Sequence, residues 1–253
     1  MLGPDEINEI ARLKRLMPAS AERDYLQELL LFSIYSKVGP ELVFKGGTCL
    51  YKLYKLSRFS EDLDFTLTKR IDIDEAVKEA IRKLRFLGVS GHVKEVKKSS
   101  REINFRLLFR GPLYRGGRQG LCFIPLNINL RERVILPPER AAISPIYREI
   151  PSFTVFSMRA EEILAEKVRA ILTRDKPRDI YDLWFLLEKG IQPDLKLVNR
   201  KIAAHRMRFN PEKFAKRIDE MAKLWRIDLK NLVIGDLPEF ELVKSVLIEK
   251  IYE

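Results

Sequence analysis

The apolar pattern of the chain changes once, near Arg159, and this change limits the folds that the chain can adopt. Before it, short segments with strand periodicity alternate with amphipathic helical segments, whereas every later segment repeats with helical periodicity. A Pro-rich stretch, residues 137–151, lies just before the change. This order predicts an α+β domain over residues 1–150, followed by a mainly α-helical domain over residues 151–253.

The same periodicity predicts the individual elements. Strands are expected at residues 41–44, 62–67, 93–96, 103–109, 120–130 and 153–156. Helices are expected at residues 5–17, 21–37, 49–56, 73–86, 160–173, 178–188, 196–205, 211–224 and 238–252.

The net charge and the hydropathy of the chain indicate which partners and which cellular location to expect. The 253 residues carry a formal net charge of +11, which favours polyanionic partners such as nucleic acid. The charged surface of a thermophile protein gives a similar composition, because the chain is rich in Lys, Arg and Glu and has only three Gln. Its apolar runs are too short for a membrane span and no signal-peptide pattern is visible, so a cytoplasmic protein with no membrane partner is expected.

A Gly-Gly turn separates the apolar segment 41–44 from the helix expected at 49–56. Thr48 stands where the N-cap of that helix is expected. The unpaired N–H groups and the dipole at a helix N-terminus favour an anion, and glycine lets a phosphate approach the backbone closely. The turn therefore indicates a phosphate site, although such a turn is more often only a turn.

Two aspartates alternate with apolar residues in the next expected strand. Asp62 and Asp64 flank Leu63, so their carboxylates project from one face of the strand. Two carboxylates in this position can hold one or two Mg²⁺ ions, which prefer oxygen ligands. The alternative is a solvated strand face or a set of ion-pair partners. The order strand, Gly-Gly turn, helix and Asp-x-Asp strand is more specific than either half alone.

These segments carry a family resemblance. KGGTCLYK at residues 45–52 and RFSEDLDF at 58–65 resemble the nucleotidyltransferase superfamily signature, in the form found in the AbiEii/AbiGii toxin family. EEILAEK at 161–167, then Arg174 and RDIYDL at 178–183, are similar to a second block of that family. The resemblance spans about residues 24–188. It implies a nucleotidyltransferase-like mixed sheet with flanking helices, followed by a helical domain.

The resemblance also implies roles for single residues. By this resemblance Asp62 and Asp64 are the catalytic residues and bind the metal, and Lys167 contacts a phosphate of the nucleotide. The residues assigned to the triphosphate are Gly46, Gly47 and Thr48.

Four further residues are assigned to the nucleotide site with an open alternative for each. Arg58 and Ser60 lie in the loop that leads into the metal-binding strand and contact phosphate, or they are a surface arginine and a turn-forming serine. Asp179 and Asp182 lie near the nucleotide pocket, or they hold two helices together. The spacing of Arg178 and Asp182 suits an internal ion pair.

One departure from the superfamily concerns a third carboxylate. In the segment 123–132, Asn127 or Asn129 stands where an acidic residue is expected. An amide ligates a metal weakly and cannot act as a general base. Another acid (Asp179, Asp182 or Glu102) completes the site, or the two aspartates suffice with a tightly held metal. The remaining alternative is that the fold is retained as a nucleotide- or RNA-binding module with weak or no turnover.

The activity implied by the resemblance is the Mg²⁺- or Mn²⁺-dependent transfer of NMP from an NTP to an acceptor. The implied acceptor is RNA, including tRNA, in a toxin–antitoxin or phage-defence setting with a cognate antitoxin protein. A protein acceptor is the main variant, and a protein-interaction role with a structural Asp-x-Asp is the third possibility. The basic clusters that suit RNA are Lys94, Lys97, Lys98 and Arg101; Arg110, Arg115 and Arg118 with Tyr114; and Arg200, Lys201, His205, Arg206 and Arg208.

Overall fold

The computed structural model describes residues 1–252, with side chains described through residue 251. The chain forms two compact units. Unit 1 comprises Met1–Lys55, Phe59–Arg133 and Pro138–Ser157. Unit 2 comprises Leu56–Arg58, Val134–Pro137 and Met158–Glu253.

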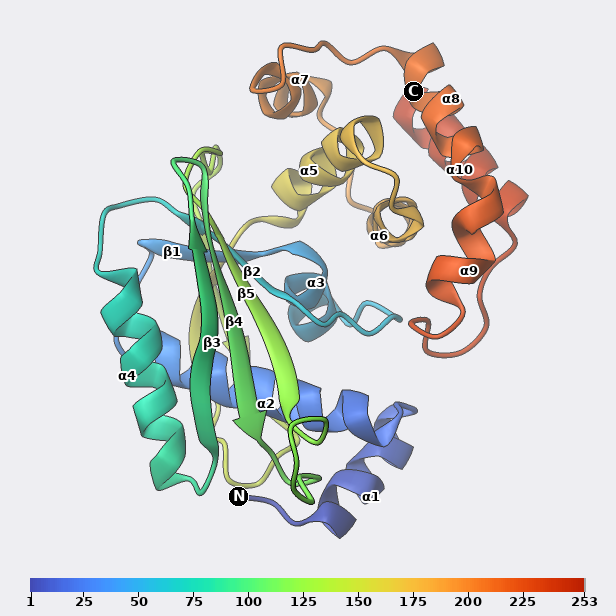
Figure 1. Ribbon diagram of the computed structural model, residues 1–253. Coiled ribbons are helices and arrows are strands. Elements are labelled where there is room, and N and C mark those ends of the chain that lie inside the picture. Colours follow the sequence, from blue (N-terminus) through green and yellow to red (C-terminus); the bar gives the residue numbers. More distant parts are fainter. Residues whose placement is uncertain (253) are drawn as a thin grey trace. The chain divides into compact units, whose positions relative to one another are not determined.

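Unit 1 is an α+β structure (Figure 1). Its helices are α1 (Pro4–Lys14), α2 (Pro18–Tyr35), α3 (Gly46–Tyr54) and α4 (Ile73–Phe86). Its strands are β1 (Leu42–Lys45), β2 (Leu63–Leu67), β3 (Ser90–Lys98), β4 (Glu102–Arg110), β5 (Cys122–Asn129), β6 (Glu139–Ile143) and β7 (Phe153–Ser157).

Within the described residues the strands of unit 1 form one seven-stranded mixed sheet in the order β3-β4-β5-β2-β1-β7-β6. β2 is parallel to β5 and antiparallel to β1, while β1 is parallel to β7. This pairing brings segments that are far apart in the sequence into one row: Lys45 of β1 is opposite Asp64 of β2, which is opposite Asn127 of β5.

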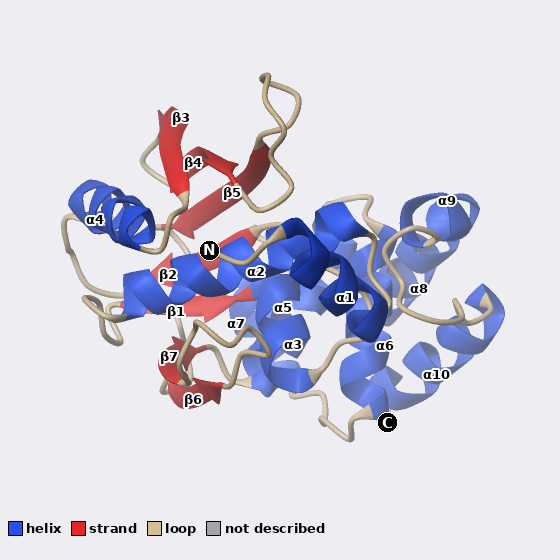
Figure 2. Ribbon diagram, turned by 90° about the horizontal axis from the view of Figure 1, so that it is seen from below, coloured by secondary structure: helices blue, strands red, loops and turns tan. Residues whose placement is uncertain are grey.

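The two faces of the sheet differ in polarity. On β4 the apolar residues Phe105, Leu107 and Phe109 are buried, while the residues between them are only half-buried. This period-2 alternation is typical of a sheet with one face in the core and one toward water. Helices α2 and α4 lie along the apolar face (Figure 2). The opposite face carries Asp64 of β2, with Asp62 directly before the strand.

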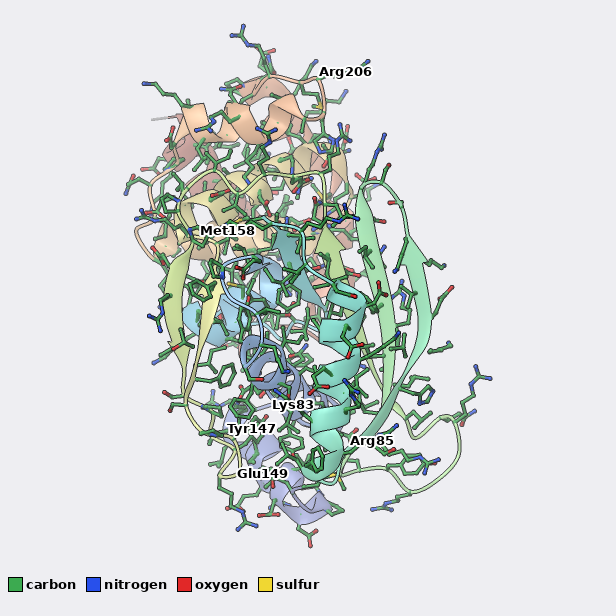
Figure 3. The ribbon with its side chains drawn as sticks, turned by 90° about the vertical axis from the view of Figure 1, so that its left-hand side faces the viewer. Lys83, Arg85, Tyr147, Glu149, Met158 and Arg206 are labelled. Carbon is green, nitrogen blue, oxygen red and sulfur yellow. The ribbon has the colours of Figure 1, made fainter. Side chains whose placement is uncertain are left out.

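A buried set of charged side chains joins α3 to α2. Lys52 of α3 donates to the carboxylates of Asp24 and Glu28 of α2, and Lys14 also donates to Asp24 at 2.5 Å. Tyr147 donates to Asp24 from the loop between β6 and β7, where Figure 3 labels it together with Glu149. Two lysines balance two carboxylates, so the charges stabilise one another away from water. The helix that begins at the Gly-Gly turn is thereby anchored at its other end.

Unit 2 is helical. Its elements are α5 (Ala160–Thr173), α6 (Pro177–Glu188), α7 (Leu195–Ala203), α8 (Pro211–Glu220), the short 3₁₀ helix η1 (Ala222–Leu224), α9 (Trp225–Leu229) and α10 (Phe240–Tyr252). Its core includes the aromatic cluster of Tyr181, Trp225 and Phe240, with ring centroids 5.6 to 6.2 Å apart. None of the described helices of the chain is long and apolar enough to span a membrane.

The expected fold class, a mixed sheet with flanking helices followed by a helical part, is confirmed. Three details of the predicted elements were wrong. The helix expected at 211–224 ends at Glu220 as α8, and η1 and α9 follow it. Residues 139–143 form the edge strand β6 inside the Pro-rich stretch. Helix α3 begins at Gly46, with Lys45 as its N-cap, instead of after Thr48.

Candidate active site

The Gly-Gly turn forms the first turn of α3. Gly46, Gly47 and Thr48 are its first three residues, so their backbone N–H groups lack partners within the helix. Gly46 has a φ of +77°, a conformation that glycine adopts without steric cost. A Cβ on Gly46 would lie 2.7 Å from Oδ2 of Asp64. The absence of a side chain therefore lets the Asp64 carboxylate lie directly against the start of α3.

The main chain before Asp64 is held by two buried side chains. The amide of Gln27 on α2 donates to the carbonyls of Ser60 and Glu61, at 3.0 and 2.9 Å. The hydroxyl of Thr48 donates to the carbonyl of Asp62. Gln27 and Thr48 are both fully buried. Three consecutive carbonyls are thus hydrogen-bonded to side chains from α2 and α3, which fixes the segment that carries both aspartates.

The asparagines on β5 have separate roles. Asn127 lies next to Asp64 in the sheet and donates from Nδ2 to Asp64 Oδ1 at 3.0 Å. Asn129 accepts the backbone N–H groups of Arg131 and Glu132, at 2.9 and 2.7 Å, and so shapes the turn after β5. Of the two asparagines, Asn127 is therefore the one that lies beside Asp64, where a third metal-binding carboxylate is expected.

An acidic residue that the sequence did not single out lies beyond that turn. Glu132 pairs with Lys45 at 3.2 Å, and Lys45 is the N-cap of α3 and the neighbour of Asp64 in the sheet. Both side chains are largely buried. The row around Asp64 thus contains a lysine, an amide and two carboxylates.

The oxygen-rich set on β2 and β5 fits a hard divalent cation. Asp62 and Asp64 are half-exposed, and the Asn127 amide presents its nitrogen to Asp64, which leaves its carbonyl oxygen as a neutral ligand. Among the described residues no group of three or more His, Cys, Asp or Glu could hold a metal ion. Two carboxylates suffice for Mg²⁺, which keeps several waters and shares phosphate oxygens with its substrate.

Unit 2 contains a second charged set, which we call the α5–α6 network: Arg58, Lys167, Arg174, Asp179 and Asp182. Arg58 donates from Nε and Nη2 to the two oxygens of Asp182, both at 2.6 Å. Lys167 lies 2.9 Å from Asp179 and 2.6 Å from Asp182. Arg174 donates to both oxygens of Asp179, at 2.7 and 2.9 Å. Each aspartate is therefore bound to one arginine and shares the lysine.

Burial and charge act in opposite directions on these aspartates. Burial raises the pKa of Asp182, but Arg58 and Lys167 outweigh it and leave the pKa below its ordinary value. Burial likewise raises the pKa of Asp179, and its ion pairs with Lys167 and Arg174 leave the pKa well below the ordinary range. Both groups remain ionised at neutral pH, so they are weak candidates for a general base.

Comparison with known proteins decides the family. The family model described as "Nucleotidyl transferase AbiEii toxin, Type IV TA system" matches residues 29–246. The chain belongs to this AbiEii family. It is accordingly a nucleotidyltransferase of a toxin–antitoxin family. No curated protein sequence matches it.

Solved structures share the AbiEii fold. MenT4, a nucleotidyltransferase toxin from Mycobacterium tuberculosis H37Rv, is similar with a TM-score of 0.71 and 21% identity, over 99% of this chain and 88% of that chain. JHP933 from Helicobacter pylori is similar with a TM-score of 0.63 and 24% identity, over 94% and 93% of the two chains. A putative nucleotidyltransferase from H. pylori gives 0.64 and 24%, over 94% and 96%.

The AbiEii motif residues fall into two groups. Gly46, Gly47, Thr48, Ser60, Asp62 and Asp64 belong to unit 1, while Arg58, Lys167, Asp179 and Asp182 belong to unit 2. The Thr48 hydroxyl donates its hydrogen bond to the carbonyl of Asp62. The group that Thr48 offers to a phosphate at the start of α3 is therefore its backbone N–H. The alternative of a surface Arg58 is wrong, because the side chain is 2% exposed. The assignments of all ten residues to the nucleotide or the metal stay predictions.

The close approach of Gly46 and Asp64 gives a direct test. We expect Gly46→Ala to lower nucleotide transfer by about a hundredfold, because the new Cβ displaces the Asp64 carboxylate and small displacements at a reacting centre cost that much. The matched control is Gly190→Ala, since Gly190 has a φ of +80° but nothing within 4 Å of its Cβ position. Both variants carry the backbone strain, so any larger shift of thermal unfolding in Gly46→Ala reports its additional clash with Asp64. Equal transfer rates would show that Asp64 does not need its place beside Gly46.

Proposed function

We propose that this AbiEii nucleotidyltransferase binds an NTP with Mg²⁺ or Mn²⁺ and transfers NMP to a hydroxyl of an RNA, with tRNA among the candidate acceptors. The observation that carries the proposal is the Asp64 carboxylate held against the first turn of α3. A carboxylate beside unpaired backbone N–H groups suits a ligand that brings both phosphate and a divalent cation. Membership of a toxin–antitoxin family further supports a cognate antitoxin.

The chain's own groups have distinct tasks in this reaction. The N–H groups of Gly46, Gly47 and Thr48 orient the triphosphate and stabilise charge on its oxygens. Asp62 and Asp64 are the residues that would hold the cation. When bound, the cation neutralises developing charge and lowers the pKa of the attacking hydroxyl. Asn127 keeps Asp64 Oδ1 oriented through its hydrogen bond.

The bond changes follow from this arrangement. The oxygen of the acceptor hydroxyl attacks the α-phosphorus in line, and the bond between the α-phosphorus and the bridging oxygen breaks. Pyrophosphate leaves with that electron pair, and the hydroxyl proton passes to solvent. Lys167 remains a proposed contact of the nucleotide phosphates, since a lysine serves as a point charge for phosphate.

The proposal is tested by incubating the protein with each α-labelled NTP, Mg²⁺ or Mn²⁺, and total RNA. Labelled RNA is the expected product. Labelled protein in place of labelled RNA would show that the acceptor is a protein. Nucleotide binding without any labelled product would overturn the proposed transfer to RNA.

The amide of Asn127, in the place of a third carboxylate, supports one refinement of the proposal. Without that carboxylate, nucleotide transfer at this site is slow. We expect Asn127→Asp to speed single-turnover transfer by up to about 10²-fold, the lower end of what a positioned acid–base group contributes. The new carboxylate faces Asp64, and two adjacent carboxylates raise one another's pKa, so the gain should increase with pH. Asn104→Asp is the matched control, because Asn104 lies opposite Asn127 but one strand farther from Asp64. An equal effect of the two substitutions would contradict the refinement.

A further inference from the structure

The polar face of β3, β4 and β5 extends outward from the active-site carboxylates. We call it the open face, since α2 and α4 pack on the other side. One row of paired residues runs across four strands from Asp64 through Asn127 and Asn104 to Lys97. Adjacent strands are about 4.8 Å apart, so this row spans about 14 Å. A chain of nucleotides lying along it could therefore reach the aspartates.

Arginine and aromatic side chains occupy the neighbouring rows of the open face. Arg106 of β4 lies over the ring of Phe123 of β5, with its guanidinium carbon 5.6 Å from the ring centroid. Arg110, at the end of β4, lies over the ring of Tyr114 at 5.4 Å. Phe123 and Arg106 are half-exposed. Flat aromatic and guanidinium groups are the surfaces on which unpaired bases stack.

The segment that builds most of this face concentrates the charge of the protein. Residues 90–121 contain eight Lys and Arg against two Glu, a net charge of +6 out of +11 for the whole chain. Two of the basic clusters noted in the sequence lie at the two ends of the β3–β4 hairpin, although Lys98 of the first pairs with Asp74 of α4 on the covered side and Lys97 with Glu95. The third cluster, near residue 205, is weaker as a binding surface because Lys201 is buried and pairs with Glu162 and Glu166.

We propose that the open face binds the single-stranded segment of RNA that carries the acceptor hydroxyl. This inference rests on the proposed function, since it names the surface that holds the proposed acceptor. Lys97 and Arg110 contact phosphates, while Phe123 and Arg106 stack on bases. A sheet face suits a single strand because unstacked bases can lie flat on it, whereas a duplex hides its bases and is recognised through its grooves.

A different explanation applies to the lysines alone. β3 is an edge strand, and lysines on an edge prevent pairing with other chains. That explanation accounts for Lys97 but not for the Arg106–Phe123 stack in the middle of the face. The two explanations predict different results for charge reversal, because glutamate protects an edge as well as lysine does.

The test compares two double variants of the full chain. Lys97→Glu with Arg110→Glu reverses two charges of the open face, and Lys78→Glu with Arg85→Glu reverses two exposed charges of α4 (Arg85 is labelled in Figure 3). A labelled single-stranded RNA of about ten nucleotides is titrated at several salt concentrations. We expect RNA affinity to fall at least tenfold in the first variant only. Its salt slope should fall by about 1.4, because each phosphate that the protein no longer neutralises removes about 0.7 from the slope.

A third variant separates base stacking from attraction to any polyanion. Phe123→Leu should weaken binding of single-stranded RNA about tenfold but leave binding of poly-glutamate unchanged. Equal RNA affinity in both double variants, preference for duplex RNA, or equal losses for RNA and poly-glutamate in Phe123→Leu would overturn the inference. NTP binding and labelling are measured in parallel. RNA binding that depends on the open face, without any nucleotide transfer to RNA, would uphold the surface and remove the proposed reaction.

Discussion

Replacing either Asp62 or Asp64 with asparagine should lower nucleotide transfer by about a thousandfold while unit 1 remains folded. Stabilisation of charge by a bound cation contributes several kcal/mol to a transition state, and each 1.4 kcal/mol or so is a tenfold change in rate. Both side chains are half-exposed at the end of a strand whose apolar residues form the core, so removing one charge leaves the packing intact.

Two measurements check this expectation. Single-turnover labelling gives the rate, and the rise in melting temperature on adding Mn²⁺ reports the cation site without relying on activity. Asp5→Asn is the control, because Asp5 is an exposed aspartate of the same unit, in the first turn of α1. If no cation binds, the loss of one of two neighbouring negative charges should stabilise the protein slightly. Rates like those of the unaltered protein would rule out the assignment of the site to Asp62 and Asp64.

Sequence reasoning was strongest where one local pattern determines the structure. The alternation around Asp64 placed it on the polar face of a strand, and β2 has that form, although the strand begins at Leu63 and leaves Asp62 directly before it. There the periodicity of a single element carries the information.

Long-range hydrogen bonds were beyond the sequence. Gln27 appeared only as one of three glutamines, yet it holds the carbonyls of Ser60 and Glu61 from 33 and 34 residues away. The pair of Lys45 and Glu132 spans 87 residues. Lys45 and Glu132 meet because β2 alone separates β1 from β5 in the sheet, and strand order leaves no mark on local periodicity.

The edge strand β6 was missed for a different reason. Glu139–Ile143 is mostly exposed or half-exposed, so it lacks the apolar run that identifies a strand. Prolines on both sides made the stretch read as a connection between domains. The start of α3 was misplaced because Gly-Gly is usually outside a helix, whereas here Gly46 and Gly47 lie inside the first turn, next to Asp64.

The α5–α6 network should respond very differently to the loss of Asp182 and of Lys167. Asp182→Asn leaves the guanidinium of Arg58, which is 2% exposed, without the carboxylate that accepts two of its hydrogen bonds. Breaking a buried pair in this way typically costs about 3–5 kcal/mol of unfolding free energy. Lys167→Ala leaves Arg58 on Asp182 and Arg174 on Asp179, so each carboxylate keeps one cation and the loss of stability should be smaller.

Nucleotide titration and denaturant unfolding of both variants separate the two roles considered for Lys167. We expect Lys167→Ala to weaken NTP binding more than it lowers stability, and Asp182→Asn to do the reverse. Because the folded-state pKa values of Asp179 and Asp182 lie below the usual value of about 4, their ion pairs stabilise the fold above that pH and are lost as the pH falls through the folded-state values. Acid unfolding should therefore be less steep in Asp182→Asn, which has one such group fewer. Unchanged NTP affinity in Lys167→Ala, together with a loss of stability as large as that of Asp182→Asn, would show that Lys167 acts only to hold α5 and α6 together.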